Sequence, residues 1–130
     1  MLLTDGMFAH DGSVAPLARY LEILPKDAVI VVDDAHGAGV LGKTGKGSVE
    51  HGGVGRKQII QTITLSKAFG TYGGAILASG SLRRGILDKS MMFLGSTPLP
   101  LPLANAAVRS VQILKSDRSL RERLIVNTKF

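Results

Sequence analysis

The sequence predicts an α/β fold with a mostly parallel sheet, and three observations support this prediction. Helical patterns alternate with short apolar runs, which is typical of this fold class. Residues 28–32 (AVIVV) form an unbroken β-branched run, which is typical of a parallel strand buried on both faces. Polar residues directly follow two of the predicted strands, and open α/β sheets carry their chemistry beyond the carboxyl ends of their strands.

The first half of the chain is assigned from apolar spacing and turn residues. Residues 2–8 hold the end of a strand. A helix begins near Pro16, because proline suits a first helical turn and apolar residues follow at helical spacing. After the strand at 28–32, residues 37–55 contain eight glycines. We expect a long loop there, and loops of this length usually serve a function.

Two more strands are predicted at 59–65 and 74–79. About eight residues separate them, too few for a parallel crossover, so we expect an antiparallel pair or strands that are not neighbours. Residues 81–89 fit a short helix with Ser81 as its N-cap. Three prolines within 96–102 exclude a helix interior or a central strand. Helical spacing returns at 103–115 and at 119–126.

Composition excludes several classes of protein. The 130 residues suit one domain, and the absence of cysteine excludes disulfides, thiolate zinc sites and cysteine nucleophiles. No apolar run approaches the ~18 residues of a membrane span, and the first residues lack a secretion signal, so we expect a cytoplasmic protein. The net charge of +6 comes entirely from residues 83–130. With 5% aromatic residues and no Trp, the chain has few platforms for stacking bases, and we expect no nucleic-acid partner.

One motif is treated as misleading. Residues 37–44 (GAGVLGKT) match the phosphate-binding pattern GxxxxGK[ST]. A phosphate loop must open a helix whose N-terminus faces the phosphates, and the glycines after Thr44 disfavour such a helix. Asp33, Asp34 and His36 could offer metal ligands, but no second cluster completes the set, so we expect no metal site. We interpret Asp34 as a turn or helix-cap residue.

Lys67 follows the strand at 59–65 and has small neighbours. At the edge of a sheet such a lysine can be partly desolvated, as Schiff-base chemistry requires. Taken alone, Lys67 is more simply a surface lysine in a loop. The surrounding segments add to the case for a functional lysine.

Three segments resemble the α-oxoamine synthase family of pyridoxal-phosphate (PLP) enzymes, which have the aspartate-aminotransferase fold. They are VVDDAHGAGVLGKTGKGS (31–48), TLSKAFGTYGGAILAS (64–79) and STPLP (96–100), and the resemblance extends over about residues 4–114. It implies that residues 1–115 are the central part of the PLP-binding large domain. Residues 116–130 would begin the connection to a C-terminal small domain. Because family members are several hundred residues long, we expect a segment of a longer protein.

The resemblance also implies roles for three residues near the predicted strand ends. Lys67 would hold the cofactor covalently and move the α-proton of the substrate. Asp33 would pair with the pyridine nitrogen, so that the ring can take up carbanion electrons. His36 would hydrogen-bond the phenolic oxygen of the ring and orient the acyl thioester.

Three hydroxyl residues complete the implied site. Thr64 would bind the phosphate or the phenolic oxygen, and Ser66 would contribute a phosphate contact. Thr97 would reach the cofactor of a neighbouring subunit, so a homodimer with a shared active site is expected. The implied reaction joins a small amino acid and an acyl-CoA into a 2-amino ketone. Two alternatives stay open, namely an aminotransferase of class I/II and a non-catalytic, truncated remnant.

Overall fold

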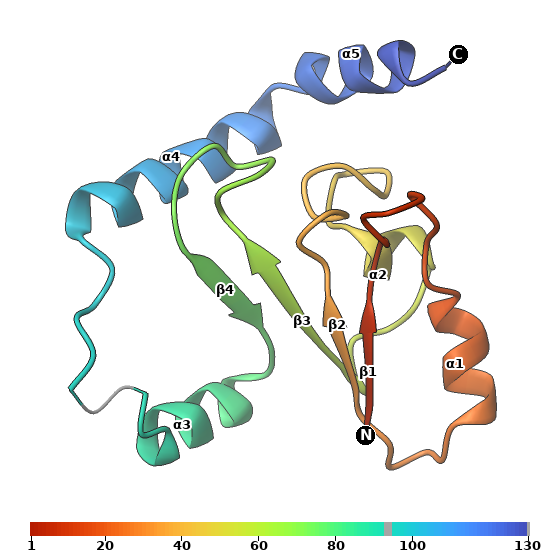
Figure 1. Cartoon of the computed structure of the whole chain (residues 1–130), viewed down its shortest axis with the longest axis vertical. Coiled ribbons are helices and arrows are strands. Elements are labelled where there is room, and N and C mark those ends of the chain that lie inside the picture. Colours follow the sequence, from red (N-terminus) through yellow and green to blue (C-terminus); the bar gives the residue numbers. More distant parts are fainter. Residues whose placement is uncertain (93–94, 130) are drawn as a thin grey trace.

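The computed structural model describes residues 1–92 and 95–129, and these contain a four-stranded sheet with helices on its flanks (Figure 1). The strands are β1 (Leu2–Asp5), β2 (Ile30–Asp33), β3 (Ile59–Thr64) and β4 (Gly74–Leu77), in the order β1-β2-β3-β4. The first three strands are parallel, and β4 is antiparallel to β3. The mostly parallel α/β fold and the antiparallel pair are therefore confirmed. The helices are α1 (Leu17–Ile23), α2 (Ser48–His51), α3 (Gly80–Lys89), α4 (Leu101–Ser116) and α5 (Ser119–Asn127).

The hydrophobic core lies on one face of the sheet, where α1 and α2 pack against β2 and β3. Side chains alternate between the two faces of a strand, so Ile30 and Val32 are fully buried while Val31 is half-buried. The prediction that this strand is buried on both faces was wrong in that respect. The buried cluster comprises Ala15, Leu17, Ile30, Val32, Val49 and Ile59.

The strand register brings polar residues to one edge of the sheet. Asp5 on β1 pairs with Asp33 on β2, which in turn pairs with Thr62 on β3. Figure 1 shows the carboxyl ends of these strands at the top of the view, where α4 and α5 run across them. The alternation of side chains along the strands directs Asp33, Thr62 and Thr64 to the face opposite the core.

Two local predictions need correction. The glycine-rich segment is not loop throughout, because Ser48–His51 forms one helical turn. The turn is held from a distance, since the Asp34 carboxylate accepts the backbone N–H of Ser48 at 2.9 Å. Helix α3 begins at Gly80, and its cap is Ser79 instead of Ser81. The hydroxyl of Ser79 accepts the Leu82 N–H at 3.2 Å.

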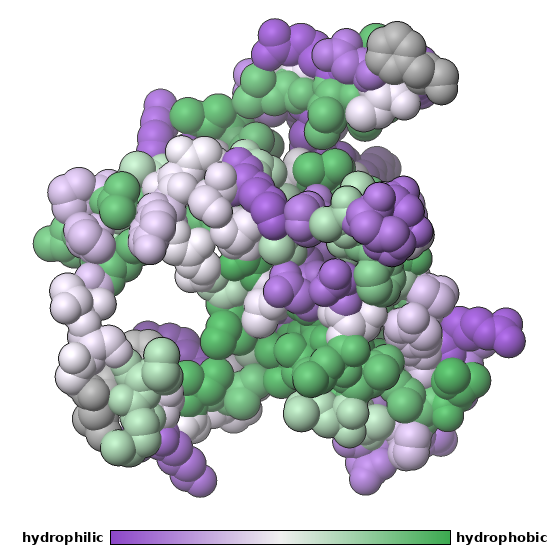
Figure 2. All heavy atoms as spheres, in the orientation of Figure 1, coloured by the Kyte–Doolittle hydropathy of each residue, from purple (hydrophilic) through white to green (hydrophobic). Residues whose placement is uncertain are grey.

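Apolar side chains remain exposed on both edge strands. Leu3 on β1 is 66% exposed, and Ile76 on β4 is 53% exposed. Figure 2 shows apolar surface over the lower part of the sheet. None of the described helices has the length and apolar character that crossing a membrane requires.

Candidate active site

A lysine and a histidine from neighbouring strand ends meet at the carboxyl edge of the sheet. Lys67 follows β3 and His36 follows β2, and the distance from Lys67 Nζ to His36 Nε2 is 3.0 Å. Both residues line a cavity of about 480 Å³, and its lining also includes Leu114 of α4 and Leu124 of α5. Lys67 is exposed, so the expected desolvation by protein is not seen. The imidazole contact is what sets this lysine apart.

A carboxylate and two hydroxyls lie at the same two strand ends. Asp33 ends β2, and its Oδ1 accepts the N–H of Ala35 at 3.0 Å, which fixes the orientation of the carboxylate. Beyond β3, the hydroxyl oxygens of Thr64 and Ser66 are 2.8 Å apart. The structure thus brings five of the six predicted site residues to the carboxyl ends of adjacent parallel strands. Their roles toward a cofactor stay predictions.

Thr97 is the sixth predicted residue, and it lies elsewhere. It is exposed in the segment between α3 and α4, on the left of Figure 1. It is not among the residues that line the cavity of His36 and Lys67. Its predicted contact with a neighbouring subunit stays a prediction.

The loop that resembles a phosphate-binding motif already holds a carboxylate. Glu50 of α2 accepts the backbone N–H groups of Thr44 and Lys46, both at 3.0 Å, and the Thr44 hydroxyl at 2.7 Å. The Thr44 amide, which belongs to the motif at 37–44 and would face a phosphate in a nucleotide-binding loop, is therefore used by Glu50. Burial raises the pKa of Glu50, but these hydrogen bonds outweigh it and hold the pKa below its usual value. Sequence analysis did not single out Glu50.

Asp34 is fully buried beside this loop. Its Oδ2 accepts the Ser48 N–H at 2.9 Å and the Gln61 side-chain amide at 2.5 Å. Gln61 is itself buried, and its carbonyl oxygen accepts from Arg56 at 2.6 Å. Burial raises the pKa of the Asp34 carboxyl, although its hydrogen bonds act in the opposite direction. The interpretation of Asp34 as a turn residue is confirmed, because its backbone oxygen accepts the Ala38 N–H and no described helix begins beside it. Its carboxylate instead accepts the N–H of Ser48, the first residue of α2, 14 residues later.

Arg121 ties α5 to the same loop. Its guanidinium donates to the backbone oxygens of Gly42 at 2.5 Å and Lys43 at 3.1 Å. The sequence offers no local signal for this contact, because its partners are 79 and 78 residues away. The loop after His36 is therefore held from inside by Asp34 and Glu50, and from outside by Arg121.

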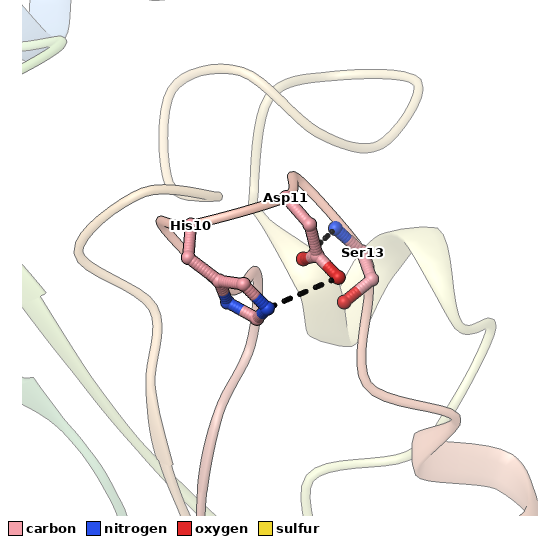
Figure 3. Close-up of polar contacts among 3 residues, drawn as sticks. All are labelled: His10, Asp11 and Ser13. Carbon is pink, nitrogen blue, oxygen red and sulfur yellow. Dashed lines mark hydrogen bonds and ion pairs between the residues drawn. The ribbon is translucent and has the colours of Figure 1, made fainter.

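The other candidate polar cluster is a surface turn. Figure 3 shows His10 beside Asp11, with 3.4 Å between His10 Nε2 and Asp11 Oδ2, while Asp11 also accepts the Ser13 N–H at 2.9 Å. The His10 side chain is 79% exposed, so this pair belongs to turn structure. Within residues 1–92 and 95–129, no three His, Asp or Glu side chains are grouped to hold a metal ion.

The family model described as aminotransferase class I and II matches residues 1–130. The chain belongs to the aminotransferase class I and II family. Among curated members, it is 38% identical over 131 residues to the 8-amino-7-oxononanoate synthase of Exiguobacterium sibiricum. It is 40% identical to 8-amino-7-oxononanoate synthase 1 of Bacillus subtilis, also over 131 residues. These alignments cover 100% of the chain but 34% and 33% of the relatives, so the chain spans about a third of their length.

Solved structures of family members match the architecture as well. An 8-amino-7-oxononanoate synthase from Francisella tularensis matches with a TM-score of 0.83 and 29% identity, covering 94% of this chain and 36% of that one. Serine palmitoyltransferase from Sphingomonas wittichii matches with a TM-score of 0.89 and 27% identity, covering 98% and 32%. A further structural relative is SPT with a PLP internal aldimine, at a TM-score of 0.88, 28% identity and coverage of 98% and 32%.

Proposed function

We propose that this chain carries the Lys-Asp-His part of the active site of a PLP-dependent acyltransferase similar to 8-amino-7-oxononanoate synthase. The observation that carries the proposal is the 3.0 Å contact between Lys67 Nζ and His36 Nε2 at the shared edge of β2 and β3. The match of the whole chain to curated synthases supports the choice of reaction.

The side chains at this edge fit the cofactor. PLP offers an aldehyde, a pyridine nitrogen, a phenolic oxygen and a phosphate, and when bound it supplies an electron sink for a carbanion. Lys67 would hold the aldehyde carbon, and Asp33 would pair with the protonated ring nitrogen. The paired hydroxyls of Thr64 and Ser66 would donate hydrogen bonds to phosphate or phenolic oxygens.

Lys67 and His36 then divide the proton chemistry. Lys67 Nζ would take the proton from the α-carbon of the amino acid, because an uncharged amine is a general base. His36 Nε2 lies close enough to accept or return a hydrogen bond to Nζ, so it would keep the amine oriented between proton transfers. His36 would also donate to the phenolic oxygen and orient the acyl thioester.

The rest of the proposal concerns the whole protein. The substrates are a small amino acid and an acyl-CoA, and the product is a 2-amino ketone. The enzyme would be a cytoplasmic homodimer in which Thr97 reaches the partner's cofactor. Residues 1–115 would be the central part of its PLP-binding large domain, and 116–130 would begin the connection to a small domain.

Reductive trapping tests the site directly. The chain is mixed with PLP, reduced with borohydride, and the labelled lysine is mapped by mass spectrometry. We expect Lys67 to be labelled in preference to the other seven lysines, and Lys67→Ala to remove this label. Lys57→Ala is the matched control and should leave the labelling of Lys67 unchanged. Equal labelling of all lysines would refute a preformed PLP site in this chain.

An aminotransferase of class I/II is the second candidate, favoured by the description of the matching family model. Asp33 and Lys67 would serve that reaction equally well. The two candidates separate by product. The acyltransferase releases free CoA thiol from an acyl-CoA, whereas the aminotransferase converts an added 2-oxo acid to an amino acid.

A further inference from the structure

The buried carboxylate of Asp34 lies two residues from His36 and takes no part in the proposed chemistry. Its side chain is fully buried, and its hydrogen-bond donors are two neutral groups, Ser48 N–H and the Gln61 amide. No Lys, Arg or His of the described chain lies within ion-pair distance of it. A carboxylate buried without a cation costs stability, which raises the question of what it does there.

Three backbone segments close around this carboxylate. A Cβ atom added to Gly6, Gly37 or Gly47 would lie 2.3, 2.2 or 1.8 Å from an oxygen of Asp34. Gly6 follows β1, Gly37 directly follows His36, and Gly47 precedes α2. Only glycine allows so close an approach at each point. The carboxylate is therefore the common contact of the three segments that surround the turn carrying His36.

The main chain of Asp34 closes that turn. Its N–H donates to the backbone oxygen of Thr62 on β3 at 2.8 Å, and its own backbone oxygen accepts the Ala38 N–H at 2.9 Å. Residues 34–38 thus form a closed turn with His36 at its centre. Side chain and main chain of Asp34 together fix this turn to β3, the strand that leads to Lys67.

We infer that Asp34 is a positioning residue that holds His36 against Lys67 by shape and hydrogen bonding. This inference rests on the proposed function, in which Lys67 is the reacting amine. Hydrogen bonds from Gln61 and Ser48 hold the Asp34 side chain, and Asp34 in turn holds the turn at 34–38. His36 in that turn contacts Lys67, with 3.0 Å between Nε2 and Nζ.

Two unpaired atoms indicate why shape matters more than charge. Asp34 Oδ1 and Ser48 Oγ are buried without a partner among the described atoms, and each lies 2.3 Å from the same point, the Cβ position of Gly6. A neutral group of the same shape would therefore lose no hydrogen bond at the Oδ1 position. Asparagine has that shape and keeps an oxygen for the Ser48 N–H and the Gln61 amide.

The test is competitive acetylation of the whole chain by a trace of acetic anhydride, with Lys67 quantified against exposed Lys57 by mass spectrometry. With His36 Nε2 accepting from Lys67, loss of the contact frees the amine, so His36→Ala should speed Lys67 labelling about five-fold. Asp34→Ala should give the same increase, and the double variant no more than His36→Ala alone. Asp34→Asn should stay within about two-fold of wild type.

The inference would be overturned if Lys67 in Asp34→Ala were acetylated at the wild-type rate, or if the effects of the two substitutions multiplied in the double variant. It would also be overturned if Asp34→Asn raised the rate as much as Asp34→Ala. If Asp34→Ala does not fold, Gln61→Met takes its place, because it keeps the volume and removes one donor to Asp34. Glu50→Gln, at the far end of the loop, is the control that should leave Lys67 labelling unchanged. The assay uses no cofactor, so its outcome is independent of whether PLP labels Lys67.

Discussion

The two halves of the described chain differ in how they bury apolar side chains. Residues 1–65 contain eight of the nine buried hydrophobic residues, whereas among the described residues after 65 the ninth, Ala107, stands alone. Helices α3 and α5 have no buried residue. The first half therefore has a core of its own. The position of the second half over the candidate site depends on fewer contacts, such as those of Arg121 with the glycine loop.

The largest predicted effect tests this difference in burial. Leu17 is fully buried in the core, with 0% of its surface exposed. Leu17→Ala should therefore lower the free energy of unfolding by about 3 to 5 kcal/mol. Val126 on α5 is 67% exposed, and Val126→Ala should change it by less than about 0.5 kcal/mol. Urea unfolding measures both. Equal losses would show that the two halves contribute alike.

The second prediction compares two glycines of the loop. A Cβ on Gly47 would lie 1.8 Å from Asp34 Oδ2, and one on Gly53 meets no atom within 4 Å, while both residues have positive φ. Gly53→Ala should cost about 1 kcal/mol through backbone strain alone. Gly47→Ala should cost about 3 kcal/mol, since overpacking is added to that strain. The thermal unfolding midpoint of each variant checks this, and similar midpoints would argue against close packing of Gly47 on the Asp34 carboxylate.

A third, smaller effect is expected at the other end of the loop. Glu50→Gln places an amide where Thr44 and Lys46 donate, so it should lower the free energy of unfolding by about 1 to 2 kcal/mol. Glu122→Gln, on exposed α5, is the matched control, with a change below about 0.5 kcal/mol. If both variants unfold at the same urea concentration, the bonds to Glu50 do not stabilise the loop.

The smallest effects should appear in the pH dependence, where Asp34 and Glu50 have opposite signs. The pKa of Asp34 is raised above 3.8 by burial, so its contribution to stability is complete below pH 3.8 and is lost as pH rises through the folded pKa. Burial alone would raise the pKa of Glu50, but its hydrogen bonds with Thr44 and Lys46 have the larger effect and hold the pKa below 4.5. Its contribution is present above pH 4.5 and is lost as pH falls through the folded pKa.

These signs can be measured as differences from wild type. The advantage of wild type over Asp34→Asn should shrink from pH 4 upward, and its advantage over Glu50→Gln should shrink from pH 4.5 downward. The free energy of unfolding is measured by urea titration at each pH. The difference between wild type and variant cancels the contributions of all other groups. Parallel slopes for the two variants would contradict the opposite environments of the two carboxylates.

The parts of the site set by local sequence could be predicted. Asp33, His36, Ser66 and Lys67 lie at or just beyond predicted strand ends, and adjacent parallel strands bring their ends together. Thr64 was expected from the family resemblance. The burial of Asp34 could have been predicted too, since residues 30, 32 and 34 share one face by alternation. Its interpretation as a turn residue stopped at its position after the strand and did not use that spacing.

Other contacts were beyond sequence analysis because they join distant segments. Glu50 meets Thr44 only because a helical turn forms at Ser48–His51, in a segment whose glycines argue against a helix. The turn exists because Asp34 accepts the Ser48 N–H across 14 residues. Helix caps supplied by a distant side chain leave no pattern in the local sequence.

The bond between Arg121 and the Gly42 carbonyl also bears on the order of events during synthesis. At roughly 5 to 20 residues per second, the 79 residues between them take roughly 4 to 16 s to add. The core of residues 15–59 can assemble during that interval, with Asp34 and Glu50 already in place. The bonds of Arg121 to the glycine loop form after those of Asp34 and Glu50. A nascent chain therefore passes through a period in which its sheet has formed but α5 does not yet line the cavity of Lys67.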